Sequence, residues 1–216
     1  MLVKALKDTN KLIVICALVT LFFWSMPSVT DFLVYSGSGL ADGYLWTLIT
    51  ALFVHVNLLH LIGNMIFLYV FGNAVESSAG GKVMMAVFFV GGVGSFLVGT
   101  YYYGYTIIMV GASAAIFALA AAAMLMKPLK SSLLFFFMPL GLVAILFFIF
   151  NLLAVYFSVG GNVGYVGHVA GFLIGIPFGM FLSKGEWVKN LGITLLLLIG
   201  FVAVILLISI AFVPFL

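Results

Sequence analysis

The sequence has few charged residues, no arginine and almost no cysteine. Charged side chains make up 6% of its 216 residues, and Cys16 is the single cysteine. One thiol cannot form an intrachain disulfide or a metal site of paired thiolates. The eight lysines are scattered along the chain and do not form the concentrated basic surface that nucleic-acid binding requires. We therefore expect no nucleic-acid partner.

Hydrophobic residues are abundant instead. They account for 66% of the sequence, and the mean hydropathy is +1.41, which is incompatible with a water-soluble domain of this length. Apolar segments able to cross a hydrocarbon core of roughly 30 Å recur along the whole chain. This pattern predicts a polytopic protein embedded in a lipid bilayer, with residues 1–216 forming one domain.

The apolar segments predict an all-α transmembrane bundle of seven helices. The basic start and first apolar run also resemble a signal peptide, but the spans that follow favour a retained first helix. The aromatic stretch from 28 to 56 is too apolar for an ordinary solvated loop, so we expect it at the outer membrane interface. The fifth span has large side chains and is expected to face mainly lipid. The expected spans are about 12–27, 57–74, 82–102, 113–127, 133–157, 165–183 and 191–213.

The lysines predict the orientation of the bundle. They occur at the N-terminus and in alternate turns between spans, whereas the other turns have none. By the positive-inside rule, we expect the N-terminus in the cytoplasm and the C-terminus outside. Ser113 and His168 then lie at similar depth, near the outer ends of two helices. The lysines concerned are Lys4, Lys7, Lys11, Lys82, Lys127, Lys130, Lys184 and Lys189.

Two polar residues in apolar segments are candidates for catalysis. Ser113 begins the alanine-rich fourth span, where the free N–H groups of a helix start can stabilise negative charge. His168 shares one stripe of the sixth span with Gly171 and Gly175, so the two thin helices can approach closely. Histidine is a suitable base because its ordinary pKa is near neutral. We predict a dyad of the nucleophile Ser113 and the general base His168.

The second span carries candidates for transition-state stabilisation. His60 and Asn64 are four residues apart, so they share one face of the helix. Both can donate hydrogen bonds, which makes them candidates for an oxyanion hole together with the amide of Ser113. His55 is expected to point away from that face and to brace the first loop. Glu76 is predicted to be a hydrogen-bonding anchor at the other end of the span.

These residues resemble the motifs of the rhomboid family of intramembrane serine proteases. Rhomboids have a Gly-x-Ser motif that opens the fourth helix and a His-x-x-Gly-x-x-x-Gly motif on the sixth. Their second helix has a His-x-x-x-x-His-x-x-x-Asn pattern and ends in Gly-x-x-x-Glu. The matching residues are Gly111, Ala112 and Ser113, then His168, Gly171 and Gly175, then His55, His60 and Asn64, and finally Gly72 and Glu76.

The resemblance implies six core helices plus one C-terminal helix. It also implies a serine endopeptidase that cuts transmembrane protein substrates near the outer membrane face, without a metal or other cofactor. Three positions depart from the usual pattern: Thr47 follows Trp46 in place of arginine, and Ala114 and Phe117 replace a glycine and a tyrosine. The ring of Phe117 is still able to pack against His168. None of these departures removes a group that the predicted chemistry requires.

The same residues allow other interpretations. Intramembrane serine and histidine also serve as packing or hydrogen-bonding residues. One alternative is a non-catalytic rhomboid-like protein that binds client transmembrane helices, although such relatives typically lack the serine or the histidine. Another is a transporter with His60 and His168 on a proton path, which would lose flux when Ser113 is changed. Metal binding by the histidines is disfavoured because no carboxylate or thiolate accompanies them.

Overall fold

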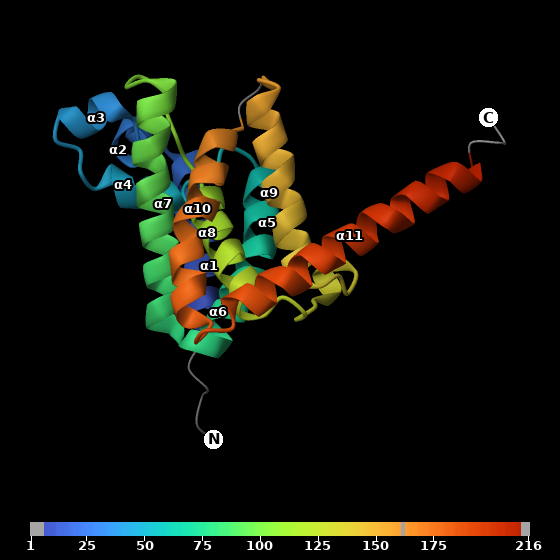
Figure 1. Ribbon diagram of the computed structural model, residues 1–216. Coiled ribbons are helices and arrows are strands. Elements are labelled where there is room, and N and C mark those ends of the chain that lie inside the picture. The colour runs from blue at the N-terminus through green and yellow to red at the C-terminus, as the bar shows by residue number, and fades with distance from the viewer. Residues whose placement is uncertain (1–6, 161–162, 213–216) are drawn as a thin grey trace.

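The computed structural model describes residues 7–160 and 163–212, and it is an all-α bundle, as predicted (Figure 1). Lys4 and Val213, which belong to the predicted basic start and last span, lie outside the described residues. The second span is continuous from Leu58 to Ala79. The other main helices are α1 (Asp8–Ser25), α7 (Gly81–Tyr103), α8 (Ser113–Met126), α9 (Leu140–Tyr156), α10 (Tyr165–Leu182) and α11 (Trp187–Phe212).

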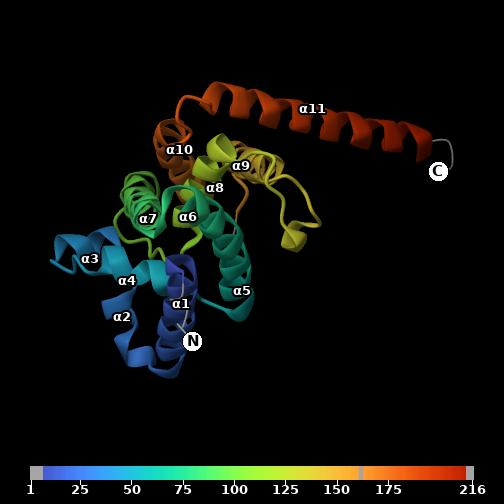
Figure 2. The same cartoon turned by 90° about the horizontal axis from the view of Figure 1, so that it is seen from below.

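Within the described ranges, five helices are long and apolar enough to cross a membrane, whereas α8 and α9 are shorter. Helix α8 has 14 residues, which is about 21 Å at 1.5 Å per residue. A helix this short is stabilised by its neighbours, because it lies among α7, α9 and α10 in the view along the bundle (Figure 2). Its side chains from Ala118 to Met126 are all buried.

Glycines on α10 permit its close contact with α8. A Cβ atom built on Gly171 would overlap the carbonyl oxygen of Ala114, and one on Gly175 would overlap that of Ala118. Only residues without a side chain let the two backbones approach so closely. The predicted glycine stripe therefore sets the distance between the helices that carry Ser113 and His168.

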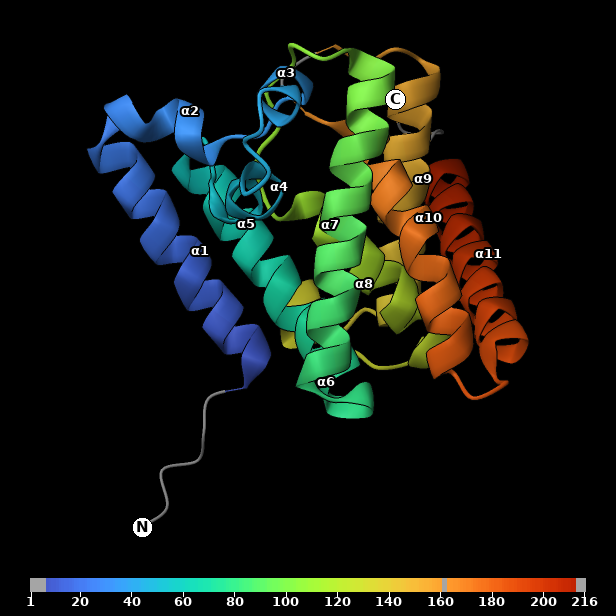
Figure 3. The ribbon, with the colours of Figure 1, turned by 90° about the vertical axis from the view of Figure 1, so that its left-hand side faces the viewer.

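The second span is not a uniform helix. Helix α5 (Leu58–Phe67) passes through a π-helical turn, Leu68–Gly72, into α6 (Asn73–Ala79). At its far end the carboxylate of Glu76 accepts the backbone N–H groups of Asp8 and Thr9, each at 2.9 Å, and the Thr9 hydroxyl at 2.5 Å. Glu76 thus caps the start of α1, which confirms the expected anchor. Figure 3 shows α1 beside α5, across the bundle from α10 and α11.

The stretch before the second span folds into short helices rather than an open loop. These are α2 (Thr30–Leu33), α3 (Gly37–Ala41) and α4 (Thr47–Thr50), with 3₁₀ turns at Pro27–Val29 and Ala51–Phe53. The Thr47 hydroxyl, at the position of the departure noted above, donates to the carbonyl of Tyr44 at 2.6 Å. Tyr35 and Met109 exchange backbone hydrogen bonds, so this segment is joined to the loop that precedes α8.

The fifth span begins later than predicted. Residues Leu133–Phe135 form a 3₁₀ turn, Phe136 and Phe137 have positive φ, and α9 starts only at Leu140. The cause is Pro139, which restricts the backbone of the residue before it and allows a helix to start only beyond that point. The expectation of a mainly lipid-facing helix was also incomplete, since its first turn, from Leu140 to Ala144, is buried.

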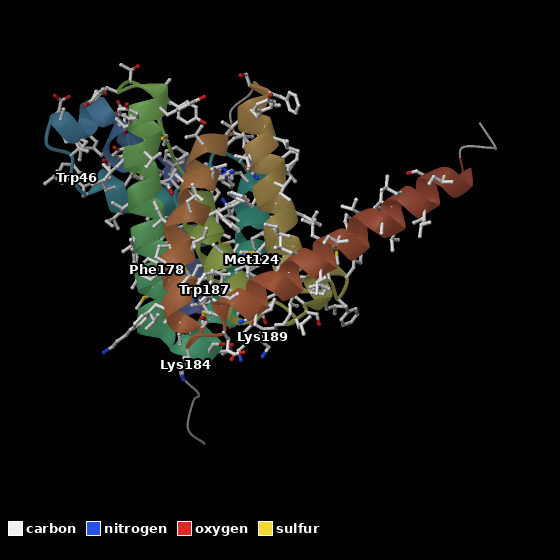
Figure 4. The ribbon with its side chains drawn as sticks, viewed as in Figure 1. Trp46, Met124, Phe178, Lys184, Trp187 and Lys189 are labelled. Carbon is white, nitrogen blue, oxygen red and sulfur yellow. The ribbon has the colours of Figure 1, made fainter. Side chains whose placement is uncertain are left out.

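Helix α11 contacts α8 and α9 near its start and then extends away from the bundle (Figure 1). Lys184, Lys189 and Trp187 lie at one end of the molecule, and Trp46 lies toward the other (Figure 4). Lys127 and Lys130 line the same pocket as Lys184, so lysines from two different turns gather at one end, as the charge pattern predicted.

Candidate active site

Ser113 and His168 are in direct contact. The hydroxyl oxygen of Ser113 lies 2.7 Å from Nε2 of His168, although the residues are 55 positions apart in the chain. Ser113 is the first residue of α8, and His168 lies in the first turn of α10. The first N–H groups of α8 have no intrahelical partner, so they surround the hydroxyl with potential donors. This geometry suits proton transfer from the serine to the imidazole.

The turn before Ser113 explains the glycine of the Gly-x-Ser motif. Gly111 has a φ of +107°, in the left-handed region that glycine favours, and its N–H donates to the carbonyl of Ala51 at 2.8 Å. A Cβ built on Gly111 would lie only 2.9 Å from Nε2 of His60 and 3.7 Å from Nδ2 of Asn64. The structure therefore brings His60 and Asn64 next to the turn that carries Ser113.

Asn64 has an unused donor at this position. Its Nδ2 atom is buried and has no hydrogen-bond partner among the described residues, and neither has Nδ1 of His60. Asn57 caps α5 through a 2.8 Å hydrogen bond from the amide of His60, which fixes the start of that helix. A buried donor without an acceptor is costly, so this amide is available to bind an acceptor that enters the site beside Ser113.

The ring of Phe117 covers one face of the His168 imidazole. The two rings are parallel within 3°, and their centroids are 4.7 Å apart, which confirms the predicted packing. Phe117 lies one helical turn after Ser113, so α8 supplies both the hydroxyl and the surface that orients the imidazole. The tyrosine hydroxyl found in many rhomboids is not needed for this stacking.

Asn151 is the site residue that the sequence interpretation missed. Its Oδ1 atom lies 2.8 Å from Nδ1 of His168, and its Nδ2 atom donates to the carbonyl of Phe147 at 2.8 Å. The side chain is buried, with 3% of its surface exposed. The sequence did contain a signal, because Asn151 is the one amide in an otherwise apolar α9 and polar groups in such segments are costly.

His55 lies closer to the site than predicted. It precedes α5, and its ring packs edge-on against that of His60 with centroids 4.9 Å apart, so the expectation that it points away was wrong. It also braces the first loop, as expected: Nδ1 lies 3.1 Å from the Thr20 hydroxyl, and its carbonyl accepts the Trp24 indole N–H. Burial, with a smaller effect from His60, lowers the pKa of His55 to about 4. His55 is therefore neutral near pH 7.

The described residues contain no cluster of three or more side chains able to hold a metal ion. Their arrangement is a serine and a histidine in contact, with amide and imidazole donors beside them. Combined with several membrane-spanning helices, this defines a multi-pass membrane protein with a serine–histidine site at one end of its bundle.

Comparison with known proteins assigns the family. The family model for the rhomboid domain matches the sequence over residues 42–185, which include all the residues of the site. The chain belongs to the rhomboid family.

Two curated relatives are distant from this chain in sequence. Rhomboid-like protease 2 of Toxoplasma gondii is 28% identical over 155 residues, which cover 68% of this chain and 51% of that protein. Rhomboid-like protein 11, chloroplastic, of Arabidopsis thaliana is 39% identical over 71 residues, or 33% of this chain and 25% of that protein. The chain thus spans at most about half the length of these relatives.

Proposed function

We propose that this chain is an intramembrane serine endopeptidase of the rhomboid type. The observation that carries the proposal is the 2.7 Å contact between the Ser113 hydroxyl and Nε2 of His168. Family membership and the name of the Toxoplasma relative support it. The non-catalytic alternative predicts no need for this contact or for an unpartnered buried donor on Asn64.

In the proposed reaction, His168 Nε2 accepts the Ser113 proton as the hydroxyl oxygen attacks a substrate peptide carbonyl. The carbonyl oxygen becomes an oxyanion, which the amide of Ser113 and the side chains of Asn64 and His60 stabilise by hydrogen bonds. The imidazolium then gives its proton to the leaving amine, and an acyl-enzyme remains on Ser113. Water, activated by His168, releases the second product and restores the serine.

We further propose that the substrates are transmembrane proteins and that the chain lies in the cell membrane as one domain. The lysine-bearing end of the bundle would face the cytoplasm, as the positive-inside rule requires. The C-terminus would then lie outside, and Ser113 would act near the outer face, where water can enter and a substrate helix can unwind.

The test is cleavage of a single-span fusion protein by the purified chain in detergent. We expect the wild type to cut, and S113A and H168A to be inactive while keeping the wild-type unfolding temperature. A fluorophosphonate probe that reacts with activated serines should label the wild type at Ser113 but neither variant. A folded wild-type chain that neither cuts nor takes up the probe would favour the client-binding alternative.

A further inference from the structure

The buried amide of Asn151 determines which nitrogen of His168 carries a proton. Its Nδ2 group donates to the Phe147 carbonyl, so Oδ1 is left to face Nδ1 of His168. The opposite amide orientation would place two oxygens against each other at Phe147. Because Oδ1 can only accept, Nδ1 of His168 must be the donor. Nε2 is then unprotonated and faces the Ser113 hydroxyl, as a base must.

We propose that Asn151 is a positioning residue that completes a chain of hydrogen bonds from Phe147 to Ser113. This proposal rests on the proposed function. The side chain of Asn151 bonds to His168 and not to the Ser113 hydroxyl, so it fixes the tautomer and the ring orientation of His168. Since Asn151 belongs to α9, that helix contributes to the reaction although it carries neither nucleophile nor base.

The test compares N151L, which removes the acceptor in a similar volume, with N151D, which keeps an oxygen facing Nδ1. We expect N151L to lower kcat by on the order of 100-fold with little change in KM, because the tautomer and orientation are no longer fixed. N151D should retain kcat within about tenfold of the wild type, since its carboxylate still accepts from Nδ1. If N151L does not fold, N151A takes its place with the same expectation.

Asn190 provides a matched control. It is also buried and donates to a carbonyl, that of Leu125 at 2.7 Å, but it lies at the opposite end of the bundle. N190L should lower the unfolding temperature without lowering kcat. An active chain in which N151L keeps its kcat, or N151D falls as far as N151L, overturns the role of Asn151 alone. A wild-type chain that neither cuts nor takes up the probe overturns the proposed function and this role with it.

A second, independent observation concerns a pocket at the opposite end of the bundle, which we call the lysine pocket. It has a volume of about 650 Å³ and lies where α6, α8, α10 and α11 meet. Three lysines and three serines contribute to it, and its one carboxylate, Glu186, already pairs with Lys189 at 2.6 Å. The lining side chains used here are Lys127, Lys130, Lys184, Ser77, Ser78 and Ser183.

The charges in this pocket are uncompensated. Among the described residues, Lys127, Lys130 and Lys184 form no ion pair with a carboxylate, and the Lys130 ammonium donates to the Ser77 hydroxyl at 3.2 Å. Burial and the nearby charges of Lys7 and Lys127 lower the pKa of Lys130, so the ammonium groups repel one another there. Several cations and hydroxyl donors around one concavity suit a phosphate group.

We propose that the lysine pocket binds a phosphate-bearing anion. Its position at the end of the membrane-spanning helices makes an anionic phospholipid headgroup one source, and free inorganic phosphate is the other. Met126 and Leu182 also line the pocket, and their apolar surface provides a place for the first part of an acyl chain.

The test measures the unfolding temperature of the full chain in detergent as phosphatidylglycerol, phosphatidylcholine or inorganic phosphate is added. We expect stabilisation by phosphatidylglycerol, with the half-maximal concentration raised about 25-fold in the K130Q/K184Q double variant, because each lysine contributes roughly a factor of five. K82Q removes an exposed lysine that does not line the pocket and should behave as wild type. Equal stabilisation by inorganic phosphate would identify the free ion as the ligand. No preference over phosphatidylcholine, or equal losses in K82Q and the double variant, would overturn the proposal.

Discussion

Replacing Gly171 by alanine tests how closely α8 and α10 must approach for the site to work. The new Cβ would lie 2.9 Å from the carbonyl carbon of Ala114 and closer still to its oxygen, with Oγ of Ser95 at 3.1 Å. Carbon atoms in contact are normally about 3.5–4.0 Å apart. Because the obstacle is backbone rather than a flexible side chain, the helices must separate by about 1 Å.

That separation acts directly on the proposed dyad, because Ala114 follows Ser113 and Gly171 lies one turn after His168. The hydroxyl-to-Nε2 distance of 2.7 Å would rise to about 3.5 Å or more, beyond a useful hydrogen bond. A misplacement of about 1 Å typically costs on the order of 100-fold in rate. We also expect a loss of about 1–3 kcal/mol in the free energy of unfolding from overpacking.

The assay is the cleavage rate of the single-span fusion protein at saturating substrate, together with the rate of fluorophosphonate labelling at Ser113. The matched control is G167A on the same helix, where a Cβ would meet nothing within 4 Å. It should cut and label as the wild type does. If G171A is folded and keeps its rate within about threefold of G167A, the close approach of the helices is not what positions the base.

Three further predictions concern residues around the bundle. E76Q should lower the free energy of unfolding by about 2 kcal/mol, because it weakens the charge-assisted hydrogen bonds to α1. Thermal unfolding measures this loss, and the folded fraction should keep its kcat. A loss of kcat without a loss of stability would contradict the prediction. F117L should lower kcat about 2- to 10-fold, because it removes the ring that stacks on His168, whereas F117Y keeps a ring and should cut at the wild-type rate. Equal rates for the wild type, F117L and F117Y would show that the stacking is unimportant. The pKa of His55 is depressed to about 4, so between about pH 6.5 and pH 4 the unfolded chain binds a proton that the folded chain does not. The free energy of unfolding should therefore fall by up to about 3 kcal/mol as the pH is lowered through that window. Thermal unfolding of H55Q over the same pH range should show a smaller fall, and an unchanged pH dependence would assign the effect to other groups.

The sequence predicted the structure best at residues whose chemistry allows few environments. Glycines three and seven residues after His168 predicted a thin helix face, and the structure places that face against the backbone of α8. Likewise, Glu76 in an apolar segment had to find hydrogen-bond donors, and the free N–H groups at the start of α1 supply them. Both predictions follow because the other arrangements, a larger side chain between close helices or a carboxylate without donors, are energetically unfavourable inside a membrane.

Other features depend on contacts that no local pattern contains. The π-helical turn at Leu68–Gly72 changes which face of the second span the later residues occupy, and nothing in its apolar sequence marks it. The contact between His55 and His60 requires the chain to bend before α5, so helical spacing gave the wrong direction. Two features were visible but unused: Pro139 indicates where α9 must begin, and Asn151 is an amide that an apolar helix would not carry without a partner.

The short length of α8 has a consequence for how the protein is made. At about 21 Å it cannot cross a hydrocarbon core of roughly 30 Å as a stable, independent segment. It packs mainly against α7, which is synthesised before it, and against α10, which begins about 40 residues after the end of α8. The packing around α8 is therefore incomplete until α10 has joined the bundle, and α10 is also the helix that carries His168. The contact between Ser113 and His168 thus forms only when α10 packs against α8, so a partly synthesised chain lacks this pair.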